Sequence, residues 1–170
     1  MKHWLLFSCA AIIFFGCKPV QQTGKTSVNP FNYSIQKKAV ASNGMVVSAH
    51  PLASTVGMQV MQKGGNAFDA VIATQLALAV VFPNAGNLGG GGFLVAQQSN
   101  GALMALDYRE MAPAAAHRDL YLDTKGEVQA DKAMNGHLSS GVPGTVAGLF
   151  QTLPYAKLPF EQLIQPAIDL

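Results

Sequence analysis

One segment constrains the fold of this chain more than any other, because it has the length of a helix and is apolar on nearly every face. Residues 67–82 read AFDAVIATQLALAVVF, in which Asp69 and Gln75 interrupt the apolar pattern. A helix that is apolar all round must be covered on all sides. The run is short for a bilayer span and contains these two polar residues. We therefore predict a central helix that is buried all round between other layers of the fold.

The residues on the amino-terminal side of this segment carry further signals. Asn66 is a predicted N-cap, and Asp69, three residues later, approximates a capping box. Residues 51–65 begin with proline, repeat apolar side chains at helical spacing and end in Gly-Gly, which predicts a helix with a left-handed stop. The β-branched and apolar run at 44–49 predicts a short strand before that helix.

A run of four glycines, Gly89–Gly92, follows the apolar helix and precedes the apolar stretch that begins at Phe93. Glycine allows positive φ angles and a close approach to the main chain, but it costs conformational entropy, so we expect this run to have a specific role. Phosphate binding is the alternative. It is disfavoured because no Lys-Ser or Lys-Thr follows the glycines and a strand, not a helix, is predicted next.

A hairpin is predicted after the glycines, because Asn100-Gly101 lies between two apolar runs and suits a two-residue type I′ turn. Its second strand ends at 107–110, just before Pro113, which prevents continued pairing. Two more helices are predicted, one after Pro143-Gly144 and one from near Pro159.

The amino-terminal residues have the pattern of a leader. Residues 1–16 combine Lys2 with an apolar run too short to span a bilayer, which predicts a signal peptide. Gly16 before Cys17 resembles a bacterial lipoprotein processing site, so we predict lipidation of Cys17; cleavage nearby and an uncleaved anchor remain alternatives. Residues 17–37 are rich in polar residues and proline, which is typical of a flexible tether. The predicted location is the periplasm or, through a lipid anchor, a membrane surface of a bacterium.

Composition excludes several classes of function. The formal net charge is only +2, which leaves no basic surface for nucleic acid. The two cysteines, Cys9 and Cys17, lie in or beside the leader, so the body has no thiol for a disulfide or a metal. The four histidines show no metal-ligand spacing, and we assign no metal. With 49% hydrophobic and 12% charged residues, the body at 38–170 is expected to fold as one domain or as part of one.

Three segments together resemble a known family: GGNAFDAVIATQLALAVVFPNAGNLGGGGFLV, DYREMAP and HLSSGVPGTVAGL. In this order and spacing they are similar to the amino-terminal part of the large subunit of gamma-glutamyltranspeptidase, also called glutathione hydrolase. The similarity spans about residues 38–170. It implies an α+β fold, a partial αββα sandwich of the N-terminal nucleophile hydrolase type, in a precursor that cuts itself into a large and a small subunit.

The resemblance also implies an activity. The amino-terminal threonine of the small subunit would attack the gamma-glutamyl amide of glutathione or another gamma-glutamyl donor, using its own amine as the base. The acyl group would then pass to water or to an amino acid acceptor. The family needs no metal or organic cofactor.

Arg109, in DYREMAP, matches the arginine that binds the substrate α-carboxylate in this family. A guanidinium suits that role, because it can donate two parallel hydrogen bonds to a carboxylate. The alternative is that Arg109 only neutralises Asp107 or Glu110. The glycines at 89–92 are interpreted as packing and turn residues near the site rather than catalytic donors.

Serine and threonine residues beside glycines invite a nucleophile interpretation, but the chain has no G-x-S-x-G elbow. Thr145 is more simply the start of a helix, and Ser139 and Ser140 are not assigned a role. No catalytic residue is therefore assigned within this chain.

The amphipathic pattern of the last predicted helix continues to Leu170 without a stop signal, so we expect the chain to be a fragment. Without the small subunit it would lack the threonine nucleophile and be inactive alone. Two alternatives stay open: a non-catalytic exported lipoprotein module that binds glutamate-like carboxylates, and a truncated gene product with no independent role.

Overall fold

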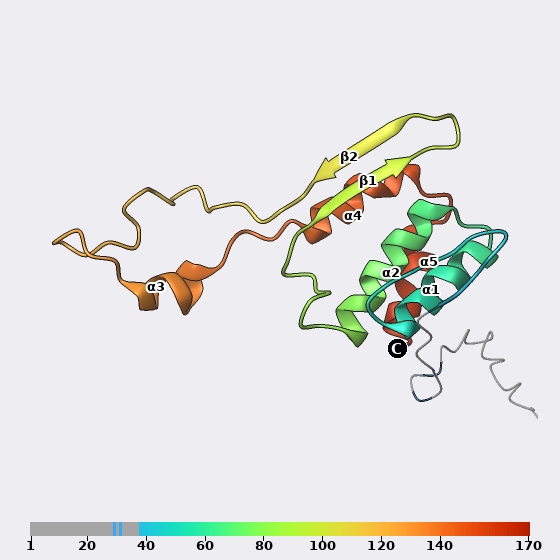
Figure 1. Cartoon of the computed structure of the whole chain (residues 1–170), viewed down its shortest axis with the longest axis horizontal. Coiled ribbons are helices and arrows are strands. Elements are labelled where there is room, and N and C mark those ends of the chain that lie inside the picture. Colours follow the sequence, from blue (N-terminus) through green and yellow to red (C-terminus); the bar gives the residue numbers. More distant parts are fainter. Residues whose placement is uncertain (1–28, 30, 32–37) are drawn as a thin grey trace, which may run out of the picture.

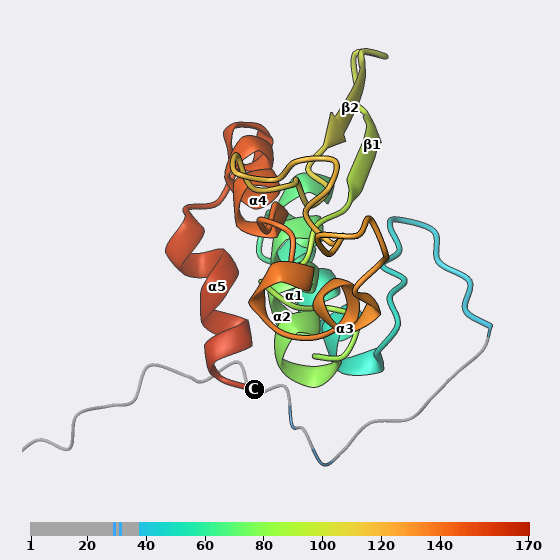
Figure 2. The same cartoon turned by 90° about the vertical axis from the view of Figure 1, so that its left-hand side faces the viewer.

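The computed structural model describes residues 29, 31 and 38–170. Helices α1, α2 and α5 form a bundle, beside which a two-stranded hairpin lies near α4 (Figures 1 and 2). In chain order the elements are α1 (Pro51–Gln62), α2 (Ala67–Val81), β1 (Phe93–Gln97), β2 (Leu103–Asp107), α3 (Ala130–Met134), η1 (His137–Ser139), α4 (Thr145–Thr152), η2 (Leu153–Tyr155) and α5 (Phe160–Ile168).

The core lies where α2 packs between α1 and α5. Ile72 of α2, Val56 of α1 and Leu163 of α5 are completely buried there. The predicted helices at 51–65, 67–82, after Pro143-Gly144 and from near Pro159 are all confirmed. Among the described residues, none of the helices combines the length and the apolar character that crossing a membrane requires.

Helix α1 ends in the left-handed stop that its sequence predicts. Gly64 has a φ of 99°, and its N–H donates to the Met61 carbonyl at 3.0 Å. The Gly65 N–H reaches the Val60 carbonyl at 3.1 Å, which completes a Schellman motif. A Cβ at Gly65 would lie 2.9 Å from that same carbonyl, so the turn also requires a glycine there.

The capping box of α2 is present and has a second function. The Asn66 side chain accepts the N–H groups of Phe68 and Asp69, and Asp69 Oδ2 accepts the Asn66 N–H at 2.7 Å. Asp69 is also completely buried, and it accepts the N–H groups of Lys157 and Leu158, which precede α5. This carboxylate therefore fastens the first turn of α2 to the carboxy-terminal helix.

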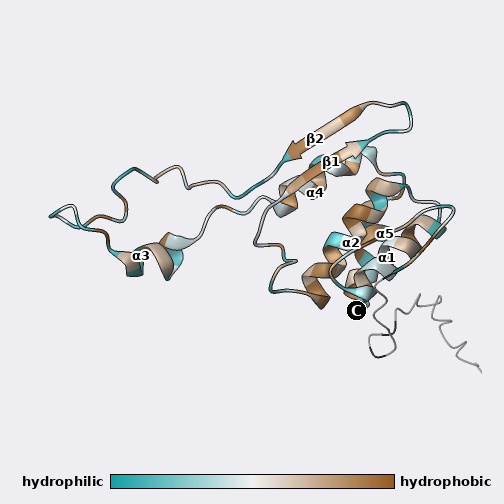
Figure 3. Cartoon of the chain, in the orientation of Figure 1, coloured by the Kyte–Doolittle hydropathy of each residue, from teal (hydrophilic) through white to brown (hydrophobic). Residues whose placement is uncertain are grey.

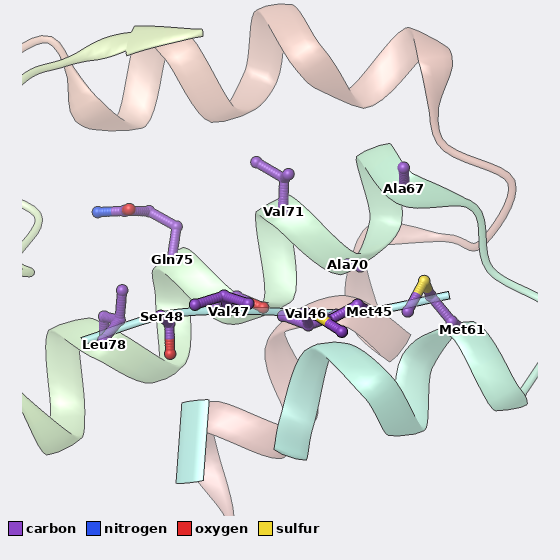
Figure 4. Close-up of a pocket in the computed structure, with 11 residues that line it drawn as sticks. Met45, Val46, Val47, Ser48, Met61, Ala67, Ala70, Val71, Gln75 and Leu78 are labelled. Carbon is purple, nitrogen blue, oxygen red and sulfur yellow. The ribbon is translucent and has the colours of Figure 1, made fainter. Parts of the chain in front are cut away.

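The prediction that α2 is buried all round is wrong for one face. Val71 is 41% exposed. Between this face and the extended residues 45–48 lies a hollow of about 400 Å³, lined by Val71, Gln75 and Leu78 on the α2 side (Figure 4). Figure 3 shows that α2 itself is hydrophobic along most of its length. The apolar face is present as predicted, but no layer of the described chain covers it.

The predicted strand at 44–49 is also not found. These residues lie across the hollow from α2, and the described part of the chain offers them no strand to pair with, since β1 and β2 pair only with each other. A β-strand is defined by its partner, so an extended apolar segment without one is not a strand.

The predicted hairpin is confirmed. β1 and β2 are antiparallel, with Val95 opposite Ala105. The turn differs in size: the Gln98 N–H donates to the Ala102 carbonyl and the Gly101 N–H to the Gln98 carbonyl, both at 2.9 Å. This pattern encloses three residues rather than two, and Gly101, with a φ of 86°, takes the left-handed position at its end.

A long arm leaves the end of the hairpin and returns to α4 (Figure 1). A bridge between Met111 and Val142 closes its base, with N–H to carbonyl distances of 3.1 and 2.8 Å. Within the arm, the Tyr121 hydroxyl donates to the Leu138 carbonyl at 2.7 Å. The bridge matters for the site, because it holds the residue that follows Glu110.

Candidate functional site

Arg109 lies two residues after the end of β2. Its backbone N–H donates to Asp107 Oδ1 at 3.0 Å, which turns the chain away from the hairpin. Its guanidinium Nε lies 3.4 Å from Glu110 Oε2, and Cζ lies 5.6 Å from the centre of the Phe93 ring. One carboxylate and one aromatic face therefore orient the guanidinium.

The Arg109 side chain is 62% exposed, and Glu110 engages only its Nε. The two terminal nitrogens have no hydrogen-bond partner among the described residues, so their N–H groups can be offered to a ligand. Asp107 binds the backbone of Arg109 and not its guanidinium. The pair with Glu110 exists, but it is exposed and does not neutralise a buried charge, which was the alternative that the sequence left open. Chemically, this arrangement can bind a carboxylate with two parallel hydrogen bonds.

Glu110 is held in its ionised form. Its own backbone N–H is the largest cause of a lowered pKa, and the Arg109 side chain and the Gly91 backbone lower that pKa further. A negative charge on Glu110 at neutral pH fixes the orientation of the neighbouring guanidinium.

The glycine run lies against the segment that carries Arg109. A Cβ at Gly91 would be 2.7 Å from the Tyr108 carbonyl oxygen and 2.8 Å from the Glu110 nitrogen. The Gly90 carbonyl accepts the N–H groups of Gly144 and Thr145 at 2.9 and 3.0 Å. Gly90 and Gly91 thus join the hairpin end to the start of α4, as expected for packing residues. Gly89 makes no such close approach.

Helix α4 approaches the same segment from the other side through two glycines. A Cβ at Gly144 would overlap the Tyr108 carbonyl, and one at Gly148 would be 2.6 Å from Cδ2 of the Tyr108 ring. Sequence reasoning missed Tyr108, Gly144 and Gly148. The signal was available, because glycines four apart share one face of a helix and allow close packing on that face.

Of the other residues considered from the sequence, Thr145 lies beside Gly90, close to Glu110, and Ser139 lies in the arm. Thr145 is the first residue of α4 and is buried, as predicted for a helix start. The Ser139 hydroxyl donates to the Gly136 carbonyl at 2.7 Å, within the arm. Cys17 lies outside the described residues. Within the described part, no three His, Cys, Asp or Glu side chains are grouped so as to hold a metal ion.

Comparison with known proteins assigns the chain to a family. The family model described as "Gamma-glutamyltranspeptidase" matches residues 53–170, which include β1, β2, Arg109 and α4. The chain belongs to the gamma-glutamyltranspeptidase family. The resemblance stated from the three sequence segments is therefore confirmed.

Individual relatives of the chain agree with this family assignment. It is 44% identical over 146 residues to the glutathione hydrolase proenzyme of Escherichia coli strain K12, covering 83% of this chain and 25% of that protein. It is 50% identical over 131 residues to the glutathione hydrolase proenzyme of Pseudomonas sp. strain A14, covering 76% and 23%. The chain thus spans about a quarter of the length of these curated relatives.

A solved structure supports the fold. The crystal structure of Helicobacter pylori gamma-glutamyltranspeptidase matches with a TM-score of 0.75 and 48% identity, covering 78% of this chain and 38% of that one. The mixed helix and sheet fold of this chain is therefore that of its family.

Proposed function

We propose that this chain is the amino-terminal part of the large subunit of a gamma-glutamyltransferase and glutathione hydrolase. The observation that carries the proposal is the Arg109 guanidinium, exposed at the end of β2 in a chain of this family with its terminal nitrogens unpaired within the described part. In this role Arg109 binds the α-carboxylate of the gamma-glutamyl donor, such as glutathione, with two parallel hydrogen bonds.

The chemistry follows from placing the glutamyl group. An amino-terminal threonine of the small subunit, formed when the precursor cuts itself, attacks the gamma-carbonyl carbon while its own amine accepts the hydroxyl proton. The amide C–N bond breaks, and the amine product leaves with that proton. Water or an amino acid then attacks the acyl-enzyme and releases glutamate or a new gamma-glutamyl compound. Arg109 holds the donor through these steps but takes no proton.

The small subunit is also the proposed partner in the fold. One face of the hairpin is apolar and open, since Phe93, Val95 and Leu103 are 63%, 80% and 78% exposed. Residues 45–48 are extended and have no partner strand in the described part of the chain. Further strands of the same precursor would pair with this segment and cover the hairpin, completing the αββα sandwich.

The amino-terminal region is proposed to export the protein, with residues 1–16 as the signal peptide, Cys17 as the lipidated residue and 17–37 as the tether. The support is the sequence pattern alone. Labelling cells with a palmitate analogue tests the anchor: the label should be attached to the wild-type protein and absent from Cys17→Ser. Labelling of both proteins, or of neither, would exclude Cys17 as the anchor.

Turnover tests the proposed activity. The complete coding frame that contains this chain should give a two-subunit protein that hydrolyses gamma-glutamyl-p-nitroanilide, whereas the purified 170-residue chain should give no turnover above background. A complete frame without such activity would contradict the proposal. Binding of glutamate by the isolated chain, together with an inactive complete frame, would favour the non-catalytic carboxylate-binding module.

A further inference from the structure

Tyr108, the residue before Arg109, is enclosed by glycines from two separate parts of the chain. From the glycine run, Gly91 lies against its carbonyl and Gly92 against its ring, where a Cβ would be 3.0 Å from the ring edge. From α4, Gly144 lies against the same carbonyl and Gly148 against the same ring. We call these four glycines the Tyr108 seat.

The seat holds the backbone as well as the ring. The Tyr108 N–H donates to the Gly92 carbonyl at 3.0 Å, one residue beyond the last strand pair of the hairpin. On the other side of Arg109, the Met111 N–H donates to the Val142 carbonyl at 3.1 Å. Arg109 and Glu110 are thus the two residues between a pair of fixed points. The direction in which the Arg109 side chain projects therefore depends on how closely Tyr108 packs against the four glycines.

We propose that Tyr108 is a positioning residue for Arg109, and that Gly148 is the position in α4 that sets its depth. The proposal rests on the proposed function in so far as Arg109 binds the donor carboxylate. A methyl group at 148 would push the ring outward, since a close contact with a packed ring has no flexible end that could yield. The backbone at Tyr108 and Arg109 would shift, and the guanidinium could no longer donate two parallel hydrogen bonds to the α-carboxylate of the donor.

The ring, and not the hydroxyl, carries this role. Within the described part of the chain the Tyr108 hydroxyl has no hydrogen-bond partner. A Cβ at Gly92 would meet the ring edge at 3.0 Å and the hydroxyl at 3.1 Å, whereas the three atoms nearest to a Cβ at Gly148 all belong to the ring. Tyr108→Phe should therefore keep the ring packed against the four glycines. Tyr108→Leu, which lacks a ring, should pack against them poorly. Gly89→Ala is the matched control, because a Cβ there meets only Asn87 Oδ1 at an ordinary 3.4 Å.

Amide hydrogen exchange of the full chain tests the seat without any assay of activity. In Gly148→Ala and in Tyr108→Leu, exchange at the Tyr108 and Met111 amides should accelerate at least about tenfold relative to Ile72 in the core. Tyr108→Phe and Gly89→Ala should match the wild type. Unchanged exchange at both amides in Gly148→Ala and Tyr108→Leu would overturn the proposal.

Kinetics of the complete enzyme test whether the seat acts through Arg109. Gly148→Ala should raise KM about tenfold for a donor with a free α-carboxylate, leave kcat nearly unchanged, and have little effect on a donor whose α-carboxylate is amidated. In an Arg109→Lys background the same substitution should add little. Equal effects on both donors, or full additivity with Arg109→Lys, would overturn the positioning role. If the unsubstituted enzyme does not distinguish the two donors, the proposal that Arg109 binds the α-carboxylate is contradicted. The hydrogen-exchange result then still tests whether the four glycines hold Tyr108 in place.

Discussion

The Asp69 carboxylate accepts the Leu158 N–H at 2.8 Å, joining residues that lie 89 positions apart. The same side chain accepts the N–H groups of Lys157 and of Asn66. All of these donors would lack a partner if the carboxylate were removed. A buried carboxylate surrounded by backbone donors is a structural feature here, and it explains why the only acidic residue of the apolar helix α2 is tolerated.

Asp69→Ala should therefore destabilise the chain strongly. Leaving several part-buried N–H groups without their acceptor, and a cavity at a buried position, is expected to cost about 3 kcal/mol, and the melting temperature should fall by roughly 10 °C. Asp119→Asn, an exposed change in the arm, is the control and should stay within about 0.5 kcal/mol of wild type. Equal melting temperatures for Asp69→Ala and wild type would show that the two ends of the chain are not fastened at this residue.

Asn66 should contribute less. Its side-chain oxygen caps α2, and its amide donates to the Tyr155 carbonyl at 2.8 Å. Asn66→Ala removes both contacts and should cost about 1 to 2 kcal/mol. Asn66→Asp keeps the cap but loses the donor, so chemical denaturation should place it between Asn66→Ala and wild type. If Asn66→Asp is as unstable as Asn66→Ala, the contact with Tyr155 and not the cap is the important one.

The helices and the hairpin could be predicted because their signals are local. Asn66 with Asp69 marks the start of α2, Gly64-Gly65 marks the end of α1, and Asn100-Gly101 marks the hairpin. The strand at 44–49 and the complete burial of α2 were wrong for one reason. Both predictions depend on which other segments pack against these residues. An apolar pattern indicates only that the residues must be buried, not which element buries them.

The candidate site likewise has a part that the sequence predicted and a part that it did not. Arg109 was assigned by its match to the family motif, and the structure adds its contacts with Glu110 and Phe93. Tyr108 could not be identified from the sequence as the partner of the α4 glycines, because its seat joins them to a glycine run far away along the chain. Glycine spacing in α4 indicates a close contact, but it does not identify the residue that fills it.

The Arg109–Glu110 pair should respond to acid below the usual range of a glutamate. The pKa of Glu110 is lowered from its ordinary value of 4.5, so the pairing is fully present above that value and is lost only as the pH falls through the lower, folded value. NMR titration of the Glu110 carboxyl carbon should give a midpoint below 4.5.

Arg109→Gln distinguishes the causes of that shift. Because the Glu110 backbone N–H is the largest cause and Arg109 a smaller one, the midpoint should rise in Arg109→Gln but remain below 4.5. A midpoint that returns fully to the ordinary value would show that the arginine alone lowers the pKa of Glu110. A midpoint at or above 4.5 in the wild type would contradict the geometry of the site.

The most direct measurement is KM for gamma-glutamyl-p-nitroanilide with the complete enzyme carrying Arg109→Lys. Lysine keeps the positive charge but lacks the two parallel N–H donors of the guanidinium. KM should therefore rise roughly ten- to a hundredfold, which corresponds to a loss of about 1.4 to 2.8 kcal/mol of binding free energy. Arg118→Lys changes the other arginine of the chain, in the exposed arm, and should leave KM unchanged. A raised KM in Arg109→Lys alone supports a carboxylate-binding arginine at the end of β2, whereas an unchanged KM would remove Arg109 from the site.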